Sequence, residues 1–107
     1  MAGAVKHAEV RWYRFAKPDK RRPVLVLSRS SAIPYLGELT VAPITSTVRG
    51  IPSEVPLGPS DGMPRECAVN LDHLQTVQKA RIGALVTTLR PERMDEVREA
   101  ILFALEL

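Results

Sequence analysis

The chain has 107 residues, of which 45% are hydrophobic and 25% are charged. That length suits one domain, residues 1–107, with a modest core, and the composition excludes a disordered tail. No apolar run approaches the roughly 20 residues of a membrane span, and the N-terminus lacks the apolar stretch of a secretory signal. We therefore expect a cytoplasmic protein. The lone Cys67 and the two separated histidines give no disulfide and no recognisable metal motif, so we expect no cofactor.

Positive charge gathers in the first half of the chain. Residues 1–50 hold nine Lys or Arg against three Asp or Glu, whereas residues 51–107 hold six against nine. Eleven of the fifteen cations are arginine, whose forked guanidinium suits phosphate groups. This distribution favours an anionic partner such as a nucleic acid. A solvated surface in an arginine-preferring proteome is the alternative.

Residues 9–15, EVRWYRF, predict a first strand because aromatic and β-branched residues are frequent in them. Val10 and Trp12 fall on one face of this strand, and Arg11 and Tyr13 fall on the other. Trp12 either packs in the core or stacks on a base.

A short turn-like loop at 16–20 leads to the apolar run 23–29, PVLVLSR, which predicts a strand buried on both faces. After a loop at 30–37, residues 38–45 predict a third strand. Pro43 within that strand indicates an edge position or a bulge, because proline cannot donate a ladder hydrogen bond.

The segment 46–67 is rich in proline and glycine and predicts an irregular connection with one short strand at 52–57. Residues 67–77 alternate loosely between apolar and polar and predict one or two short strands. Residues 78–86 predict a last turn and strand.

The C-terminal segment 91–107 has a clear helical period. Pro91 suits the first helical turn, and the acidic residues that follow complement the positive end of the helix dipole. The apolar positions expected to face the core are Met94, Val97, Ile101 and Leu105. Short strands in succession and one terminal helix predict an α+β fold with a mainly antiparallel, small barrel-like sheet.

Four segments, in this order, resemble the MazF/PemK/Kid toxins of bacterial toxin–antitoxin pairs. They are RRPVLVLSR at 21–29, VAPITST at 41–47, VNLDHLQTVQKARIG at 69–83 and the C-terminal helix. The resemblance implies an SH3-like small barrel of the CcdB/PemK kind with a C-terminal helix, usually as a homodimer. It also implies cleavage of single-stranded RNA, such as mRNA, at short motifs without a metal ion, leaving 2′,3′-cyclic phosphate and 5′-hydroxyl ends.

The resemblance places the catalytic arginine at Arg22, directly before PV, and the catalytic threonine at Thr45, within PITS. A guanidinium neutralises the charge that builds on the phosphorane oxygens when the 2′-hydroxyl attacks phosphorus. A threonine hydroxyl can donate to a phosphate oxygen or orient the 2′-hydroxyl. The general base is Asp72 by resemblance, although Asn70 stands where some relatives have arginine, and His73 is a second candidate.

Other residues are expected to contact RNA because they carry charged, hydroxyl or amide groups in or beside the matching segments. They are Lys20, Arg21, Ser46, Arg49, Asn70, His73 and Gln75. Arg65 is a further cation, in a loop that the resemblance places near the RNA-binding groove of the family. Structural roles stay open for several of them, such as turn capping by Asp72 and backbone bonding by Gln75. We expect Cys67 to be a small buried apolar residue.

Two other functions remain open at this point. CcdB gyrase poisons resemble the family in fold and act by binding a protein, but they lack the Arg22 and Thr45 pair. An RNA-binding barrel without activity is the other, because Asn70 departs from the family pattern. A toxin requires a cognate antitoxin, and we expect a MazE-like partner whose acidic tail covers the basic cleft.

Overall fold

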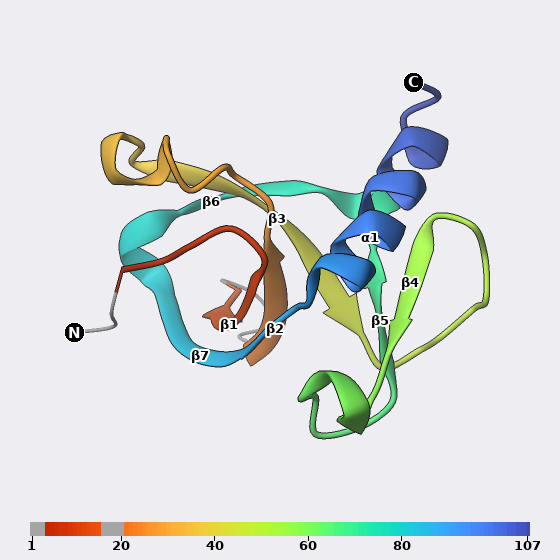
Figure 1. Cartoon of the computed structure of the whole chain (residues 1–107). Coiled ribbons are helices and arrows are strands. Elements are labelled where there is room, and N and C mark those ends of the chain that lie inside the picture. The colour runs from red at the N-terminus through yellow and green to blue at the C-terminus, as the bar shows by residue number, and fades with distance from the viewer. Residues whose placement is uncertain (1–3, 16–20) are drawn as a thin grey trace.

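The computed structural model describes residues 4–15 and 21–107 (Figure 1). Within these residues, seven strands precede one C-terminal α-helix. The strands are β1 (Glu9–Arg14), β2 (Arg21–Val26), β3 (Glu38–Thr45), β4 (Glu54–Leu57), β5 (Cys67–Asn70), β6 (Gln75–Gln78) and β7 (Ile82–Thr88), and the helix is α1 (Pro91–Ala104). The connections contain short 3₁₀ turns, which are η1 (Ile33–Tyr35), η2 (Pro59–Asp61), η3 (Leu71–His73) and η4 (Lys79–Arg81).

The strands form one antiparallel sheet in the order β4-β5-β3-β2-β1-β7, with β6 paired to β3. The predicted antiparallel sheet and terminal helix are confirmed. The expected small barrel is instead an open, curved sheet, because η4 joins β6 to β7 end to end and no ladder links these two strands among the described residues. No helix in the described part of the chain is both long and apolar enough to cross a membrane.

β3 is the central strand, so the edge position predicted from Pro43 is wrong. One side of β3 pairs with β2 through residues 41–43. On its other side β3 pairs first with β6, through residues 38–41, and then with β5, through residues 44–45. Pro43 pairs with Val24 of β2, and on the other side of β3 it falls between the ladder to β6, which ends at Val41, and the ladder to β5, which begins at Ile44.

The sheet buries apolar side chains on both faces of β2, as predicted. Val24, Leu25 and Val26 are all fully buried. Leu25 belongs to an apolar cluster under α1, and the buried Val97 and Ala100 of the helix are part of the same cluster. The opposite face forms a second cluster inside the curve of the sheet, built from Tyr13, Val24, Val26, Ile33, Leu39, Val41, Val77 and Ile82.

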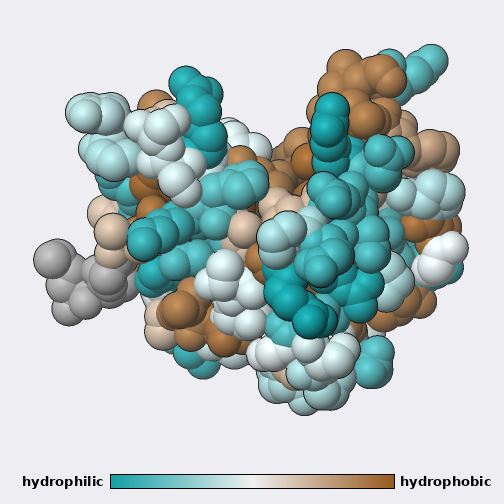
Figure 2. Space-filling view, in the orientation of Figure 1, coloured by the Kyte–Doolittle hydropathy of each residue, from teal (hydrophilic) through white to brown (hydrophobic). Residues whose placement is uncertain are grey.

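The core-facing side of α1 differs from the prediction at its end. Met94 and Ile101 pack against the cluster under the helix, as expected. Leu105 is half exposed because α1 ends at Ala104, one residue before it. Phe103 and Leu107 are exposed as well, and Figure 2 shows hydrophobic surface over this end of the helix.

Candidate functional site

A groove of about 450 Å³ lies where the start of β2, the end of β3 and the loop before β5 meet. Three arginines and three hydroxyl side chains line it, and none of the described lining residues is acidic. The full lining is Trp12, Arg21, Arg22, Pro23, Ile44, Thr45, Ser46, Thr47, Met63, Pro64, Arg65 and Cys67. The groove is therefore positively charged and rich in hydrogen-bond donors.

One side of the groove, here called the strand wall, consists of Arg21, Arg22, Thr45 and Ser46. Both arginines are exposed, although the next three residues after Pro23 are buried, so the rigid strand holds their backbone while their heads reach solvent. No described residue forms an ion pair with Arg22. Its guanidinium is free to bind an anion through forked hydrogen bonds.

Arg21 is held in the groove by Trp12. The guanidinium carbon of Arg21 lies 4.2 Å from the centre of the indole ring, which is a cation–π contact. Trp12 is half-buried, lines the groove and carries Arg21 on its ring. The two basic side chains at the start of β2 therefore differ, since Arg21 contacts Trp12 whereas Arg22 has no ion-pair partner within residues 4–15 and 21–107.

Thr45 ends β3 beside this pair of arginines. The Thr45 Oγ1 atom accepts a hydrogen bond from the Thr47 backbone N–H at 3.1 Å. Because that bond occupies an acceptor position, the hydroxyl proton remains available to donate. The buried Ile44 fixes the backbone just before it, and the exposed Ser46 adds a second hydroxyl.

The other side, here called the loop wall, consists of Met63, Pro64 and Arg65 from the connection between β4 and β5. Met63 is buried and Arg65 is exposed. Cys67 follows at the start of β5 and is buried, which confirms the expectation from the sequence. Burial, together with the charges of Glu66 and Asp61, raises the pKa of the Cys67 thiol, so it stays protonated and is a poor nucleophile.

The remaining predicted residues lie apart from the groove. Asn70 caps η3 by accepting a hydrogen bond from the Asp72 backbone N–H at 2.9 Å, and its amide lies 3.2 Å from Nδ1 of His73. The Asp72 carboxylate accepts a hydrogen bond from the Ser53 hydroxyl. This polar group, here called the η3 cluster, lies at the opposite end of β5 from Cys67.

Three other predicted contacts are also outside the lining. Gln75 is exposed at the start of β6, where it pairs with Val41 of β3. Arg49 is exposed in the connection before β4, and its backbone N–H donates to the buried Glu54. Lys20 lies outside the described residues.

The structure thus brings together Arg21, Arg22, Thr45 and Ser46 with Arg65, the further cation that the sequence analysis named, in the lining of one groove. Sequence reasoning missed Thr47, Met63 and Pro64. Thr47 was visible as the third residue of TST, directly after two predicted positions. Met63 and Pro64 carried no signal, because only the pairing of β4 with β5 places their loop beside β2.

The family model and the relatives that match this chain all belong to the MazF-like toxins. The family described as PemK-like, MazF-like toxin of type II toxin-antitoxin system matches residues 6–105. The probable endoribonuclease MazF5 of Mycobacterium tuberculosis is 45% identical over 100% of this chain and 94% of the relative. Endoribonuclease MazF3 of the same species is 39% identical over 86% of this chain and 89% of the relative.

Two solved structures share the fold closely. The Mycobacterium tuberculosis toxin MazF-mt6 has a TM-score of 0.85 and 35% identity, covering 92% of this chain and 97% of that one. A mycobacterial endoribonuclease in complex with its cognate antitoxin has a TM-score of 0.87 and 26% identity, covering 97% of each chain.

Proposed function

The chain belongs to the PemK-like, MazF-like toxins of type II toxin–antitoxin systems, and we propose that it is a sequence-specific endoribonuclease that cleaves single-stranded RNA without a metal ion. The observation that carries this proposal is the groove in which Arg22 and Thr45 converge with two further arginines. Such a surface attracts a phosphodiester backbone, and the described lining residues include no carboxylate that would repel it.

The proposed reaction is the one that the family resemblance implies, and the strand wall carries the groups that would perform it. The 2′-oxygen forms a bond to the adjacent phosphorus as its proton leaves to a base, and the bond from phosphorus to the 5′-oxygen breaks as that oxygen takes up a proton. The products are a 2′,3′-cyclic phosphate and a 5′-hydroxyl. Arg22 neutralises the phosphorane oxygens, and Thr45 donates its hydroxyl proton to one of them.

The proton acceptor remains a prediction. Asp72 and His73 are the candidates, and both belong to the η3 cluster rather than to the lining of the groove. Asn70 and Gln75, together with Arg49, Lys20 and Arg21, are proposed to contact the RNA on either side of the scissile phosphate. Asn70, Gln75 and Arg49 lie outside the lining of the groove, so their contacts would extend the bound strand beyond it.

The partners follow from the same charge pattern. We propose a MazE-like antitoxin whose acidic tail lies over the arginines of the groove and blocks Arg22. Support comes from the mycobacterial endoribonuclease and the Deinococcus radiodurans MazF, whose structures contain an antitoxin or MazE. A homodimer that acts in the cytoplasm is part of the same proposal.

A CcdB-like gyrase inhibitor is not favoured, because the curated relatives are named endoribonucleases. The test incubates the purified chain with several long single-stranded RNAs in EDTA and maps the new ends. We expect discrete cuts with 5′-hydroxyl ends, which disappear with Arg22→Ala and persist with Arg98→Ala, a matched loss of an exposed arginine on α1. A folded wild-type chain that cuts none of the RNAs would overturn the proposal and favour a binding protein.

A further inference from the structure

The residues of the loop wall belong to a connection between two strands and form no ladder hydrogen bonds with the sheet. Loop 58–66 links β4 to β5, whose ladder ends at the pair Leu57 and Cys67. Within the loop, the Asp61 and Met63 backbone N–H groups donate to the Gly58 carbonyl at 2.9 and 3.3 Å, and the Gly62 N–H donates to the Pro59 carbonyl at 3.0 Å. These three bonds all lie in the first six of the nine residues, so the loop needs side-chain contacts to hold one position, because ordering a loop costs conformational entropy.

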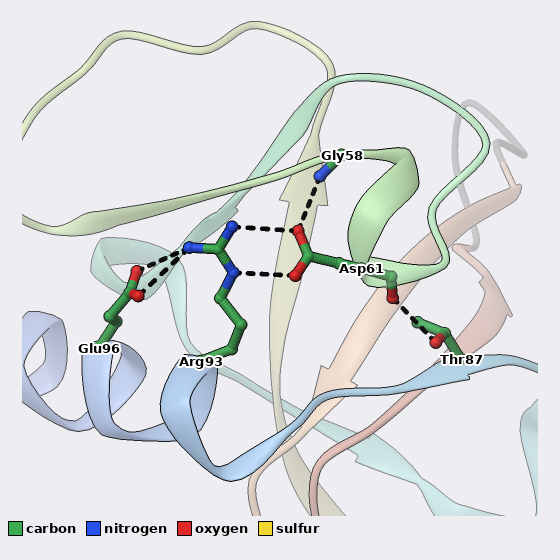
Figure 3. Close-up of polar contacts among 5 residues, drawn as sticks. All are labelled: Gly58, Asp61, Thr87, Arg93 and Glu96. Carbon is green, nitrogen blue, oxygen red and sulfur yellow. Dashed lines mark hydrogen bonds and ion pairs between the residues drawn. The ribbon is translucent and has the colours of Figure 1, made fainter.

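One buried carboxylate supplies those contacts. The side chain of Asp61 is only 1% exposed, and Arg93 of α1 binds it with both arms of its fork. The Arg93 Nε atom lies 2.8 Å from Oδ1 and its Nη2 atom lies 3.3 Å from Oδ2. The Gly58 N–H donates to the same carboxylate at 3.0 Å, so this one side chain joins the start of the loop to the helix (Figure 3).

A second tie joins the loop to β7. The Thr87 hydroxyl donates to the Asp61 carbonyl at 2.9 Å, and Figure 3 shows it on the other side of Asp61 from Arg93. Gly62 follows with φ of 90°, and a Cβ at this position would clash with the Thr87 hydroxyl. Only glycine therefore lets the loop pack this closely on β7 and then turn toward Met63 in the groove.

The far side of Arg93 is also engaged. Its Nη1 atom donates to both carboxylate oxygens of Glu96, at 3.0 and 3.2 Å, one turn along α1. The Arg93 guanidinium is therefore bound by two carboxylates and has little freedom to rotate, unlike a solvated surface cation. α1 itself is anchored by its buried Val97 and Ala100.

We propose that Asp61 and Arg93 are positioning residues of the groove: their ion pair fixes loop 58–66 so that Arg65 is presented opposite Arg22 and Thr45, and this sets which RNA motif is bound. The inference deepens the proposed ribonuclease function and rests on it. Asp61 lies four residues before Arg65, and neither Asp61 nor Arg93 lines the groove. The pair therefore acts on RNA only through the loop.

The test compares Asp61→Asn with Glu99→Gln, which makes the same chemical change at an exposed position of α1. Steady-state cleavage is measured on an oligoribonucleotide with the mapped motif and on versions with single base changes. For Asp61→Asn we expect KM to rise about 5–10-fold, the equivalent of one charged contact, with kcat within about twofold and weaker discrimination between motifs. A folded Asp61→Asn protein with wild-type KM and wild-type discrimination would overturn the inference.

A double-mutant cycle separates positioning from general stability. If Asp61 acts through Arg65, Asp61→Asn has no further effect on KM in the Arg65→Ala background. The same rise in KM in both backgrounds would contradict the inference. If Asp61→Asn does not fold, Thr87→Val replaces it, because it removes the second tie without changing charge, and an unchanged KM then counts against the inference.

Failure of the ribonuclease proposal stays distinguishable. If the wild-type chain does not cut RNA, affinity is measured for an uncleavable oligonucleotide with 2′-deoxy sugars. A weaker affinity of Asp61→Asn than of Glu99→Gln would support the positioning role without catalysis. Equal affinities would overturn it.

Discussion

One wall of the groove consists of sheet and the other of a loop, and different forces hold them. The strand wall is held in place by ladder hydrogen bonds and by the fully buried residues 24–26 of β2. The loop wall also has the buried Met63 in the core cluster under α1, but its polar anchors are the buried Asp61 carboxylate, paired with Arg93, and the Thr87 hydroxyl. Hydrophobic burial is insensitive to pH, whereas an ion pair is lost once either charge is lost.

The difference assigns separate tasks to the two walls. Transition-state stabilisation requires donors held rigidly at the reacting phosphate, which suits Arg22 and Thr45 on the sheet. Recognition of a base tolerates adjustment, which suits a loop that carries Arg65. The comparison therefore predicts that chemistry and motif choice can be damaged independently.

The core under the strand wall carries the largest expected effect on stability. Leu25 is fully buried in the cluster under α1. Leu25→Ala is expected to lower the free energy of unfolding by about 2–5 kcal/mol and the melting temperature by roughly 10 °C or more. Urea or thermal unfolding measures it, with the half-exposed Leu85→Ala as the control. Equal losses for the two variants would refute the assignment of Leu25 to the core.

Thr45→Val tests the chemistry on the strand wall at constant shape. Valine removes the hydroxyl proton that is proposed to reach the phosphorane, so the cleavage rate is expected to fall about 100-fold, as for other oxyanion donors. Single-turnover cleavage measures this rate at saturating enzyme. A fall below about threefold would assign Thr45 a structural role only.

The loop wall is expected to respond to pH where the strand wall does not. Arg93 holds the pKa of Asp61 below its ordinary value of 3.8, with further help from the Gly58 N–H and the charge of Arg90. A lowered pKa means that the pair stabilises the fold above about pH 4 and loses its effect as the pH falls through the folded-state pKa. Asp61→Asn should therefore cost about 2–3 kcal/mol at pH 7 and progressively less in acid.

Urea unfolding of the wild type, Asp61→Asn and the control Glu99→Gln between pH 3 and pH 7 measures this dependence. The difference between Asp61→Asn and the wild type should shrink toward the acidic end. A difference that stays constant over this range would show that the carboxylate charge contributes nothing.

Alanine substitutions of Arg65 and Arg49 are expected to have the smallest effects, on RNA affinity, and they compare an arginine inside the groove with one outside it. Both are exposed loop arginines, but only Arg65 lines the groove. Arg65→Ala should weaken RNA binding about fivefold and lower the salt slope of binding by about one, because it removes one positive charge from the groove. Arg49→Ala should change both quantities less. Affinity titrations between 50 and 200 mM salt make the comparison, and a larger effect of Arg49→Ala would exclude the loop wall as the main contact.

Most strands and the helix could be predicted from the sequence, because local patterns of apolar residues and prolines determine where these elements lie. Residues 38–45 form β3 as expected, and the helix begins at Pro91 as expected. Strand β2 begins two residues before the predicted 23, so that Arg21 and Arg22 are part of the sheet. The missing barrel closure and the central place of Pro43 depend on partner strands, which no single segment reveals.

The sequence pointed to the residues of the strand wall and to Arg65, but not to the contacts that hold the loop wall. Arg22 and Thr45 lie in matching family segments, so the resemblance singled them out. Asp61 and Arg93 are 32 residues apart, and nothing local shows which acid meets which arginine. Arg11 is a similar case, because its burial depends on the Glu9 carboxylate and on the distant Gly83 carbonyl.

The most direct measurement of the central claim is the separate determination of kcat and KM for Arg22→Ala and Arg65→Ala on one oligoribonucleotide. We predict that Arg22→Ala lowers kcat by about 100–1,000-fold while its melting temperature stays that of the wild type. Arg65→Ala should raise KM with kcat within about twofold. Wild-type kcat in Arg22→Ala would contradict the account, because the strand wall would then not perform the chemistry.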